Sequence, residues 1–167
     1  MSRKNIELLD AFLCACLIAV ILNFMFWPFS IDGFSMENTL TDGEYVIVSK
    51  ILTDKSCIER GDLIICKLND GKKDINIIKR VIGLPGDTIE IKDGNIILNN
   101  KLLKENYIKE NFTLGETKIT LSENQLFILG DNRTISLDSR KIGPITYNDI
   151  KAKVLIRLFP ITKINIF

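Results

Sequence analysis

The feature that most constrains the fold is an uninterrupted apolar run near the N-terminus, covering residues 11–29. The run, AFLCACLIAVILNFMFWPF, carries no charge, and Asn23 is its only strongly polar side chain. About 20 helical residues cross a hydrocarbon core of about 30 Å, so the run is just long enough to span a bilayer. Arg3 and Lys4 precede the run, which favours a cytoplasmic N-terminus, and Trp27 lies at the far end, where interfacial aromatic residues gather.

A cleavable secretory signal is the competing interpretation of the same run. Such a signal ends in small residues at its cleavage site, whereas this run ends in Phe26, Trp27, Pro28 and Phe29. The bulky ending favours an anchor that is not removed. We therefore expect a cytoplasmic tail over residues 1–8, a transmembrane anchor over 9–29 and an extracytoplasmic domain over 30–167.

The overall composition is typical of one globular domain with an added apolar segment. A chain of 167 residues can bury one sizeable core, but hardly two. Its 22 basic and 21 acidic residues nearly balance, so the charge pattern gives no sign of a nucleic-acid partner. We expect a single outer domain that does not bind nucleic acid.

Four cysteines are divided between the apolar run and the outer domain. For Cys14 and Cys16, inside the run, packing or lipid contact is the simpler role, and acylation is the alternative. Cys57 and Cys66 could pair in an oxidising compartment, and the sequence leaves their proximity open. No spacing resembles a zinc site and the chain has no histidine, so no metal or cofactor is expected.

After residue 30 the pattern changes to short apolar runs separated by turn residues, which is typical of β-strands. The runs are EYVIVSKIL, DLIICKL, INIIKRVIG, TIEIKDGNIIL, KITL, QLFILG and AKVLIRLF, and the turns between them include TDG, ERG, NDG, LPGD and KDG. Asp93-Gly94 is the strongest hairpin signal. The pattern predicts a mainly β fold, in which an antiparallel β domain follows one N-terminal transmembrane helix.

Ser35 lies in a turn-like stretch, IDGFSMENTL, directly after the apolar run. One interpretation is a turn residue that hydrogen-bonds its own backbone. The other is a nucleophile, which needs a base to take its proton. Because the chain has no histidine, that base would be a carboxylate or a lysine whose pKa is lowered by burial.

Lys79 has the sequence context of such a lysine. In a strand over DINIIKRVIG, Ile75, Ile77, Lys79 and Val81 share one face, and three of the four are aliphatic. An ammonium group against that face should be partly neutral near neutral pH. The alternative is a strand that is twisted or buried on both faces, from which Lys79 extends to water.

A third stretch, LGDNRTISLDSR at 129–140, gathers many short polar side chains after an apolar strand. It is either a polar loop with Arg–Asp pairs or a buried polar site that orients a neutral lysine. The hydroxyl of Ser136 suits the second role, because it can hydrogen-bond a lysine nitrogen without adding a charge that raises the pKa.

Four stretches taken together resemble, in order, the sequence boxes of bacterial type I signal peptidases, also called leader peptidases. They are SMENTL at 35–40, RGDLII at 60–65, KRVIGLPGD at 79–87 and GDNRTISLDSR at 130–140. The resemblance covers most of the chain, up to a closing KAKVLIRLFP that looks like the last strand of the family. The short layout with one anchor is similar to the compact enzymes of Gram-positive bacteria.

The resemblance implies a role for individual residues. Ser35 matches the nucleophile, Lys79 the general base, and Ser136 the serine that orients the lysine. The supporting residues are the pair Asp138 and Arg140, the framework Asp131, Asn132 and Arg133, Met36 beside the nucleophile, and Arg80 after the lysine. We expect the substrate to bind as an added strand along Ile31, Asp32, Gly33, Phe34, Ile77 and Ile78, in small pockets that accept Ala-x-Ala-like residues.

Two positions depart from the family pattern. Asn38 stands where the family usually has proline, which predicts a less rigid turn and leaves a narrow substrate set open. Gly33 stands where some members have a serine that helps hold the oxyanion. We therefore expect backbone N–H groups, that of Ser35 foremost, to bind the oxyanion.

The resemblance thus implies a membrane-bound serine endopeptidase that removes signal peptides from secreted preproteins by a Ser–Lys dyad. The expected location is the outer face of the bacterial plasma membrane, with preproteins, the lipid bilayer and the secretion translocon as partners. One alternative is a self-cleaving repressor peptidase, which needs a DNA-binding region where this chain has its apolar run. The other is a membrane-tethered β domain or inactive homologue, against which the presence of both Ser35 and Lys79 argues.

Overall fold

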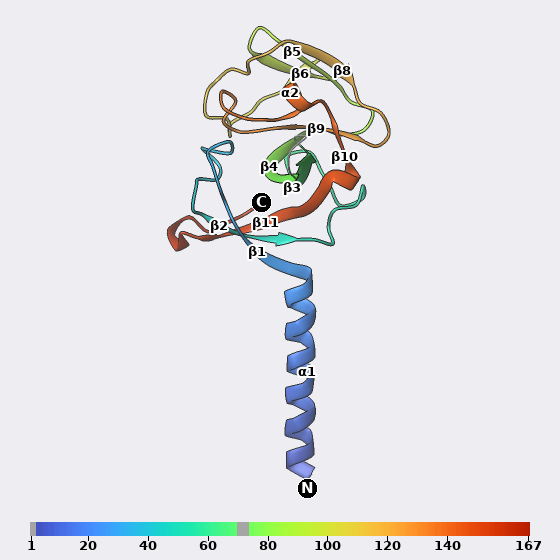
Figure 1. Cartoon of the computed structure of the whole chain (residues 1–167), viewed down its shortest axis with the longest axis vertical. Coiled ribbons are helices and arrows are strands. Elements are labelled where there is room, and N and C mark those ends of the chain that lie inside the picture. Colours follow the sequence, from blue (N-terminus) through green and yellow to red (C-terminus); the bar gives the residue numbers. More distant parts are fainter. Residues whose placement is uncertain (1–2, 70–73) are drawn as a thin grey trace.

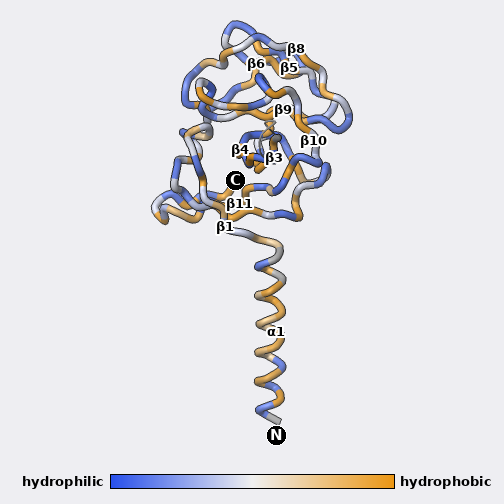
Figure 2. The backbone as a smooth tube through the Cα atoms, viewed as in Figure 1, coloured by the Kyte–Doolittle hydropathy of each residue, from blue (hydrophilic) through white to orange (hydrophobic). Residues whose placement is uncertain are grey.

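The structure is a computed structural model that describes residues 3–69 and 74–167, apart from the side chains of residues 3, 21, 24 and 69. Helix α1, Arg3–Met25, projects away from a β domain that contains the rest of the chain (Figure 1). Hydrophobic residues predominate along α1 (Figure 2). Within the described residues, no helix combines the length and the hydropathy needed to cross a membrane. The anchor expected over 9–29 therefore stays a prediction.

The helix ends before the end of the apolar run. Phe26, Trp27, Pro28 and Phe29, expected in the anchor, instead lie in strand β1, Phe26–Ser30. Proline disfavours a helical conformation in the residue before it, which explains the change of structure here. Strand β1 is the edge of its sheet and pairs antiparallel with β2, Tyr45–Ser49, so the missing N–H of Pro28 is tolerated.

Two antiparallel sheets form the β domain, which confirms the mainly β, antiparallel part of the predicted fold class. The larger sheet has the order β1-β2-β11-β3-β4-β9-β10, with β12 paired to β11. Its other strands are β3 (Leu63–Asn69), β4 (Asp74–Gly83), β9 (Gln125–Leu129), β10 (Ile145–Thr146), β11 (Ile150–Phe159) and β12 (Asn165–Ile166). The smaller sheet has the order β7-β6-β5-β8, comprising β5 (Thr88–Lys92), β6 (Asn95–Leu98), β7 (Lys101–Leu102) and β8 (Thr117–Thr120).

The predicted strand runs and the hairpin at 93–94 are confirmed. Lys92 pairs with Asn95, and Asp93 and Gly94 between them have φ of 50° and 78°, as a tight hairpin turn requires. The remaining elements are helix α2, Ser139–Ile142, and the 3-10 helices η1, Tyr147–Asp149, and η2, Ile161–Lys163.

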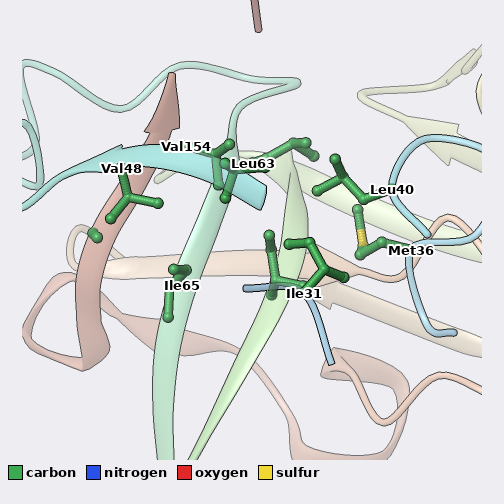
Figure 3. Close-up of a cluster of buried hydrophobic side chains, with 10 residues drawn as sticks. Ile31, Met36, Leu40, Val48, Leu63, Ile65 and Val154 are labelled. Carbon is green, nitrogen blue, oxygen red and sulfur yellow. The ribbon is translucent and has the colours of Figure 1, made fainter. Parts of the chain in front are cut away.

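Strand β4 lies between three apolar clusters. Ile78 packs into a first cluster with Ile31, Met36 and Leu40, of which Figure 3 shows the last three beside Leu63 and Val154. Val81 belongs to a second cluster and Ile82 to a third. The strand is therefore buried on both faces from Ile78 to Gly83, as in the alternative that the sequence left open. Lys79 does not extend to water, because only 2% of its surface is exposed.

Candidate active site

Ser35 and Lys79, 44 residues apart in the sequence, are in direct contact. The Lys79 Nζ lies 2.7 Å from the Ser35 Oγ and 2.7 Å from the backbone carbonyl oxygen of Ile78, and it donates a hydrogen bond to each. Ser35 is half-buried in the turn between β1 and β2, whereas Lys79 lies in the middle of β4. The fold thus brings together the two residues that the sequence singled out as nucleophile and base.

The surroundings of Lys79 favour its neutral form. Burial lowers the pKa of Lys79 from its usual 10.5 to about 8, although the negative charges of Asp138 and Asp131 act in the opposite direction.

The thiol of Cys66, on β3, has a pKa raised to about 12 by burial, so it stays uncharged. All four cysteines are free, and the disulfide considered for Cys57 and Cys66 is not formed.

Ser136 is buried beside the nucleophile segment, but it does not contact Lys79 in the expected way. Its hydroxyl makes no hydrogen bond of normal geometry among the described residues, although it lies close enough to the Asp138 carboxyl to help lower the pKa of that group, and 1% of the residue is exposed. The expected bond from Ser136 to Lys79 is therefore not formed in this structure, in which Ser35 and Ile78 bind the lysine nitrogen. A buried hydroxyl without a well-formed hydrogen bond lowers the free energy of unfolding, and functional sites are among the places where such groups occur.

Gly130 is a residue of the site that the sequence reasoning missed. A Cβ added at this position would lie 2.6 Å from the Ser35 carbonyl oxygen and would also collide with the Ser136 hydroxyl. The Gly130 N–H donates to the Asp138 carboxylate at 3.0 Å. Only glycine allows Ser35, Ser136 and Asp138 to approach one backbone position so closely. Its place at the start of the GDNR box was the available signal.

Asp138 and Arg140 form the expected ion pair. The Arg140 Nε and a terminal guanidinium nitrogen donate to the two carboxylate oxygens of Asp138 at 2.9 and 2.8 Å. Burial alone would raise the pKa of Asp138, but the bonds from Arg140 and the Gly130 N–H hold it below its usual value. Asp138 also caps helix α2, whose first turn contains Arg140.

Asp131 and Arg80 form a second buried ion pair, which contacts the nucleophile turn, residues 31–44 between β1 and β2. Arg80 donates to both carboxylate oxygens of Asp131, at 2.9 and 2.6 Å, and to the Gly61 carbonyl oxygen at 2.8 Å. The hydroxyl of Thr39, four residues after Ser35, donates to Asp131 and accepts from Arg80 at 3.1 Å. The pair therefore links strand β4 to the turn that carries Ser35.

Asn132 and Arg133 complete the expected framework. The Asn132 N–H donates to the Ser35 carbonyl oxygen at 3.1 Å, so it holds the backbone of the nucleophile directly. Arg133 is fully buried and pairs with both carboxylate oxygens of Glu105, at 2.8 and 2.5 Å. Glu105 lies in a loop between β7 and β8, and its participation was not predicted.

The expected substrate-binding residues lie in two segments, the start of the turn after β1 and strand β4. Ile31 and Ile78 are buried in the first apolar cluster, which also contains Met36, next to the nucleophile. Asp32 and Phe34 are exposed, Ile77 is half-buried, and Gly33 has φ of 96° with its N–H bonded to Asp42 at 2.7 Å. Strand β9 pairs with β4 only from Arg80 onward, so residues 75–79 keep one edge without a strand partner among the described residues.

Asn38, expected to leave the turn less rigid, makes hydrogen bonds of its own to another loop. Its backbone has φ of 91°, and its side-chain amide donates to the carbonyl oxygens of Tyr107 and Ile108 at 3.0 and 3.3 Å. Proline, the usual residue in the family, is restricted to φ near −65° and has no such donor. Asn38 therefore ties the nucleophile turn to the loop between β7 and β8.

The same loop contacts the nucleophile turn and strand β4 at two further points. The Lys109 Nζ binds the Glu37 carboxylate at 2.6 Å, and the ring of Tyr107 lies 4.0 Å from the Arg80 guanidinium carbon. Within the described chain, no group of three or more His, Cys, Asp or Glu side chains is arranged to hold a metal ion. What the site offers chemically is therefore a hydroxyl, a lysine amine and a network of supporting ion pairs.

We predict that Gly130→Ala will impair the site. The added methyl must displace the Ser35 backbone or Ser136, which should destabilise the fold by about 1 to 3 kcal/mol. It should also lower any Ser35-dependent cleavage on the order of 100-fold, since catalysis is sensitive to misplacement by about 1 Å. Urea denaturation and cleavage of a preprotein measure the two effects, with the exposed Ser122→Ala as control. Equal behaviour of the two variants would contradict this packing.

For position 38 we predict the stability order wild type, then Asn38→Gly, then Asn38→Pro. Glycine keeps the positive φ and loses the side-chain bonds, at a cost of about 1 kcal/mol. Proline cannot adopt that φ, and a cost of about 3 kcal/mol is expected. Urea denaturation of the three proteins gives the order, and a proline variant as stable as the wild type would show that the turn does not need this conformation.

Comparison with known proteins identifies the family of the chain. The chain matches the family model described as signal peptidase, peptidase S26, over residues 5–159. It is 35% identical to signal peptidase I P of Bacillus subtilis subsp. natto, over 98% of this chain and 96% of that protein. It is 36% identical to signal peptidase I U of Bacillus subtilis strain 168, over 88% of this chain and 83% of that protein. A crystal structure of a signal peptidase I from Enterococcus faecalis V583 is similar with a TM-score of 0.50 and 30% identity, covering 59% of this chain and 96% of that one. The chain therefore belongs to the signal peptidase family, peptidase S26.

Proposed function

We propose that this member of the family is a membrane-bound serine endopeptidase that removes N-terminal signal peptides from secreted preproteins, with Ser35 as nucleophile and Lys79 as general base. The observation that carries the proposal is the 2.7 Å contact between the Ser35 hydroxyl and a buried lysine whose pKa is about 8. Nucleophile and base within hydrogen-bond reach are the minimum that covalent catalysis needs. The names of the relatives support the same substrate class.

The reaction begins when neutral Lys79 accepts the Ser35 proton and the Ser35 Oγ attacks the scissile carbonyl carbon. Protonated Lys79 then gives its proton to the leaving amine, which leaves an acyl-enzyme on Ser35. A water deprotonated by Lys79 attacks the ester and releases the signal peptide. Within the described residues the Ser35 N–H has no hydrogen-bond acceptor, so it is available to bind the oxyanion, the role expected of it with glycine at position 33.

Ser136 is proposed to orient Lys79 during this cycle. When Ser35 becomes esterified, its hydroxyl no longer accepts from the lysine nitrogen, and the buried, uncharged Ser136 hydroxyl near the Ser35 backbone would be its replacement. Asp138 and Arg140 hold the loop that carries Ser136, while Asp131, Asn132, Arg133 and Arg80 hold the loops around Ser35. Met36 positions the nucleophile from the apolar side. None of these roles adds a negative charge in direct contact with Lys79.

The signal peptide would bind as an additional strand on the free edge of β4, beside residues 31–34. Main-chain bonds along such an edge give affinity for any extended sequence, and side-chain pockets give selectivity. Because Ile31 and Ile78 are already packed in the core, the pockets above them would be shallow and would select small residues. This agrees with the Ala-x-Ala-like preference implied by the family.

We place the catalytic domain at the outer face of the bacterial plasma membrane. Helix α1, which carries no charged residue from 11 to 25, supports an anchor in the bilayer, with its N-terminal end in the cytoplasm and the β domain outside. Tethering keeps the enzyme at the surface where the apolar part of a signal peptide is inserted, which raises the effective concentration of substrate. The secretion translocon is the proposed neighbour that delivers the preprotein.

The proposal is tested with the full chain in detergent and a panel of preproteins. Wild type should cut them before the mature sequence, whereas Ser35→Ala and Lys79→Ala should lose at least about 1,000-fold in rate. Cleavage should be insensitive to metal chelators. An uncut panel, or equal cutting by Ser35→Ala, would favour the non-enzymatic alternative of a tethered β domain.

The pH dependence follows from the lowered pKa of Lys79. Only neutral Lys79 can accept the Ser35 proton, so kcat/KM should rise with pH, reach half of its maximum near the Lys79 pKa of about 8, and level off above it. Initial rates on one preprotein between pH 6 and about 10 provide the measurement. A rate that falls through this range would exclude lysine as the base.

Burial of Lys79 should also lower the stability of the fold. Between about pH 8 and 10.5 the Lys79 side chain binds more protons in the unfolded chain than in the folded one, so this residue should make the free energy of unfolding rise with pH. Above about pH 9 the raised pKa of buried Cys66 acts in the opposite direction, so the contribution of Lys79 is the difference in slope between wild type and a variant without this lysine. Lys79→Met should remove this contribution and raise the unfolding free energy at pH 7 by about 1 to 3 kcal/mol. Urea titrations at several pH values, with the exposed Lys118→Met as control, would reveal the difference. An unchanged slope would mean that Lys79 keeps its ordinary pKa.

A further inference from the structure

Strand β11 places Arg157 behind the turn that carries Ser35, although 118 residues separate Arg157 from Thr39 in that turn. One guanidinium nitrogen of Arg157 donates to the Thr39 carbonyl oxygen at 2.6 Å and to the Glu44 carboxylate at 3.3 Å. Its Nε donates to the Lys163 carbonyl oxygen at 2.6 Å. The arginine thus joins the C-terminal hairpin, formed by β11 and β12, to the nucleophile turn.

Thr39 is held from both sides by charged groups. Arg157 binds its carbonyl oxygen, while its hydroxyl lies between Asp131 and Arg80. The N–H groups of Thr39 and Leu40 both donate to the Met36 carbonyl oxygen, at 3.0 and 2.8 Å. Because Met36 follows Ser35 directly, a shift of Thr39 is carried through this short hydrogen-bonded turn to the nucleophile.

Glu44 closes the other end of the same turn. Its backbone carbonyl accepts the Ile31 N–H at 2.8 Å, and its carboxylate accepts the Thr41 N–H at 3.2 Å. The side chain is 5% exposed and pairs with Arg157 at 3.3 Å and with Lys163 at 3.5 Å. Loss of Arg157 would leave this buried carboxylate with Lys163, which is more distant and largely exposed, as its cationic partner.

The apolar side of the hairpin meets the turn as well. Phe167 packs against the first apolar cluster, which contains Met36 and Leu40 from the turn. The Phe167 N–H donates to the Leu155 carbonyl oxygen at 2.9 Å, beyond the pairing of β12 with β11. Polar and apolar contacts from the C-terminus therefore support the same short segment.

We propose that Arg157 is a positioning residue for the reaction, which keeps Ser35 within hydrogen-bond reach of Lys79. The inference rests on the proposed peptidase function. Lys79 is fixed by the pairing of β4 with β3, whereas Ser35 lies on an irregular turn, so their separation depends on what holds the turn. Arg157 supplies a fixed contact to that turn from an independent strand.

The matched control is Lys153, which lies on the same strand. Lys153 pairs with Asp62 at 2.7 Å, its side chain is 16% exposed like that of Arg157, and it donates to the Cys57 carbonyl oxygen at 3.0 Å. None of these partners belongs to the nucleophile turn. Arg157→Met and Lys153→Met therefore remove comparable ion pairs from β11, and only the first should disturb Ser35.

The experiment measures kcat and KM for preprotein cleavage by the full chain in detergent, well below the melting temperature found for each variant. Arg157→Met should lower kcat on the order of 10- to 100-fold with KM changed by less than about 2-fold, since a small displacement of the nucleophile affects chemistry more than binding. Lys153→Met should stay within about 2-fold of wild type. Arg157→Lys, which can still reach Thr39 or Glu44, should recover part of the loss.

Amide hydrogen exchange provides a second readout that does not depend on activity. The amides of Thr39, Leu40 and Asn132, which report on the nucleophile turn, should exchange faster in Arg157→Met than in Lys153→Met. Equal kcat in the two methionine variants, or a loss that Arg157→Lys does not reduce while exchange is unchanged, would overturn the positioning role. Failure of the wild type itself to cleave would instead refute the proposed function.

Discussion

The interaction on which the rest of the structure depends is the burial of Lys79 against Ser35. A lysine in the middle of a strand that is buried on both faces is unfavourable as an ammonium ion, and its pKa falls to about 8. The same burial that costs stability makes the amine available as a base near neutral pH. A surface lysine at the same distance from a serine would remain protonated.

The supporting residues act on the two partners differently. The backbone of Lys79 is held by the strand pairing of β4, and its amine is hydrogen-bonded to Ser35 and to the Ile78 carbonyl oxygen. Ser35 lies on a turn, and contacts with distant segments hold that turn: among them, Asn132 binds the Ser35 carbonyl, the Asn38 amide binds carbonyls of the loop between β7 and β8, and Arg157 binds Thr39. We propose that these contacts, together with the buried ion pairs of the site, place the Ser35 hydroxyl.

Asn38 departs from the family pattern, and its side chain restricts the turn in another way. The family proline restricts the turn through its ring, whereas here a positive φ and two side-chain hydrogen bonds restrict it. In this chain a contact with another loop restricts the turn, in place of a proline ring. The shape of that loop is consequently part of the nucleophile site in this chain.

The sequence by itself determined the strand runs and the hairpin at 93–94, because these follow from local patterns of apolar and turn residues. It offered Ser35 and Lys79 as candidates, and their assignment as nucleophile and base came from the resemblance to the signal peptidase family. It placed residues 26–29 in a helix, where the chain forms strand β1, since hydropathy alone does not separate an apolar helix from an apolar edge strand. Only the tertiary structure decided that β4 is covered on both faces, that Gly130 has no room for a side chain, and that Glu105, Asn38 and Arg157 reach the site. These contacts join segments far apart in the chain, and the pattern around each residue carries no information about which distant partner it meets.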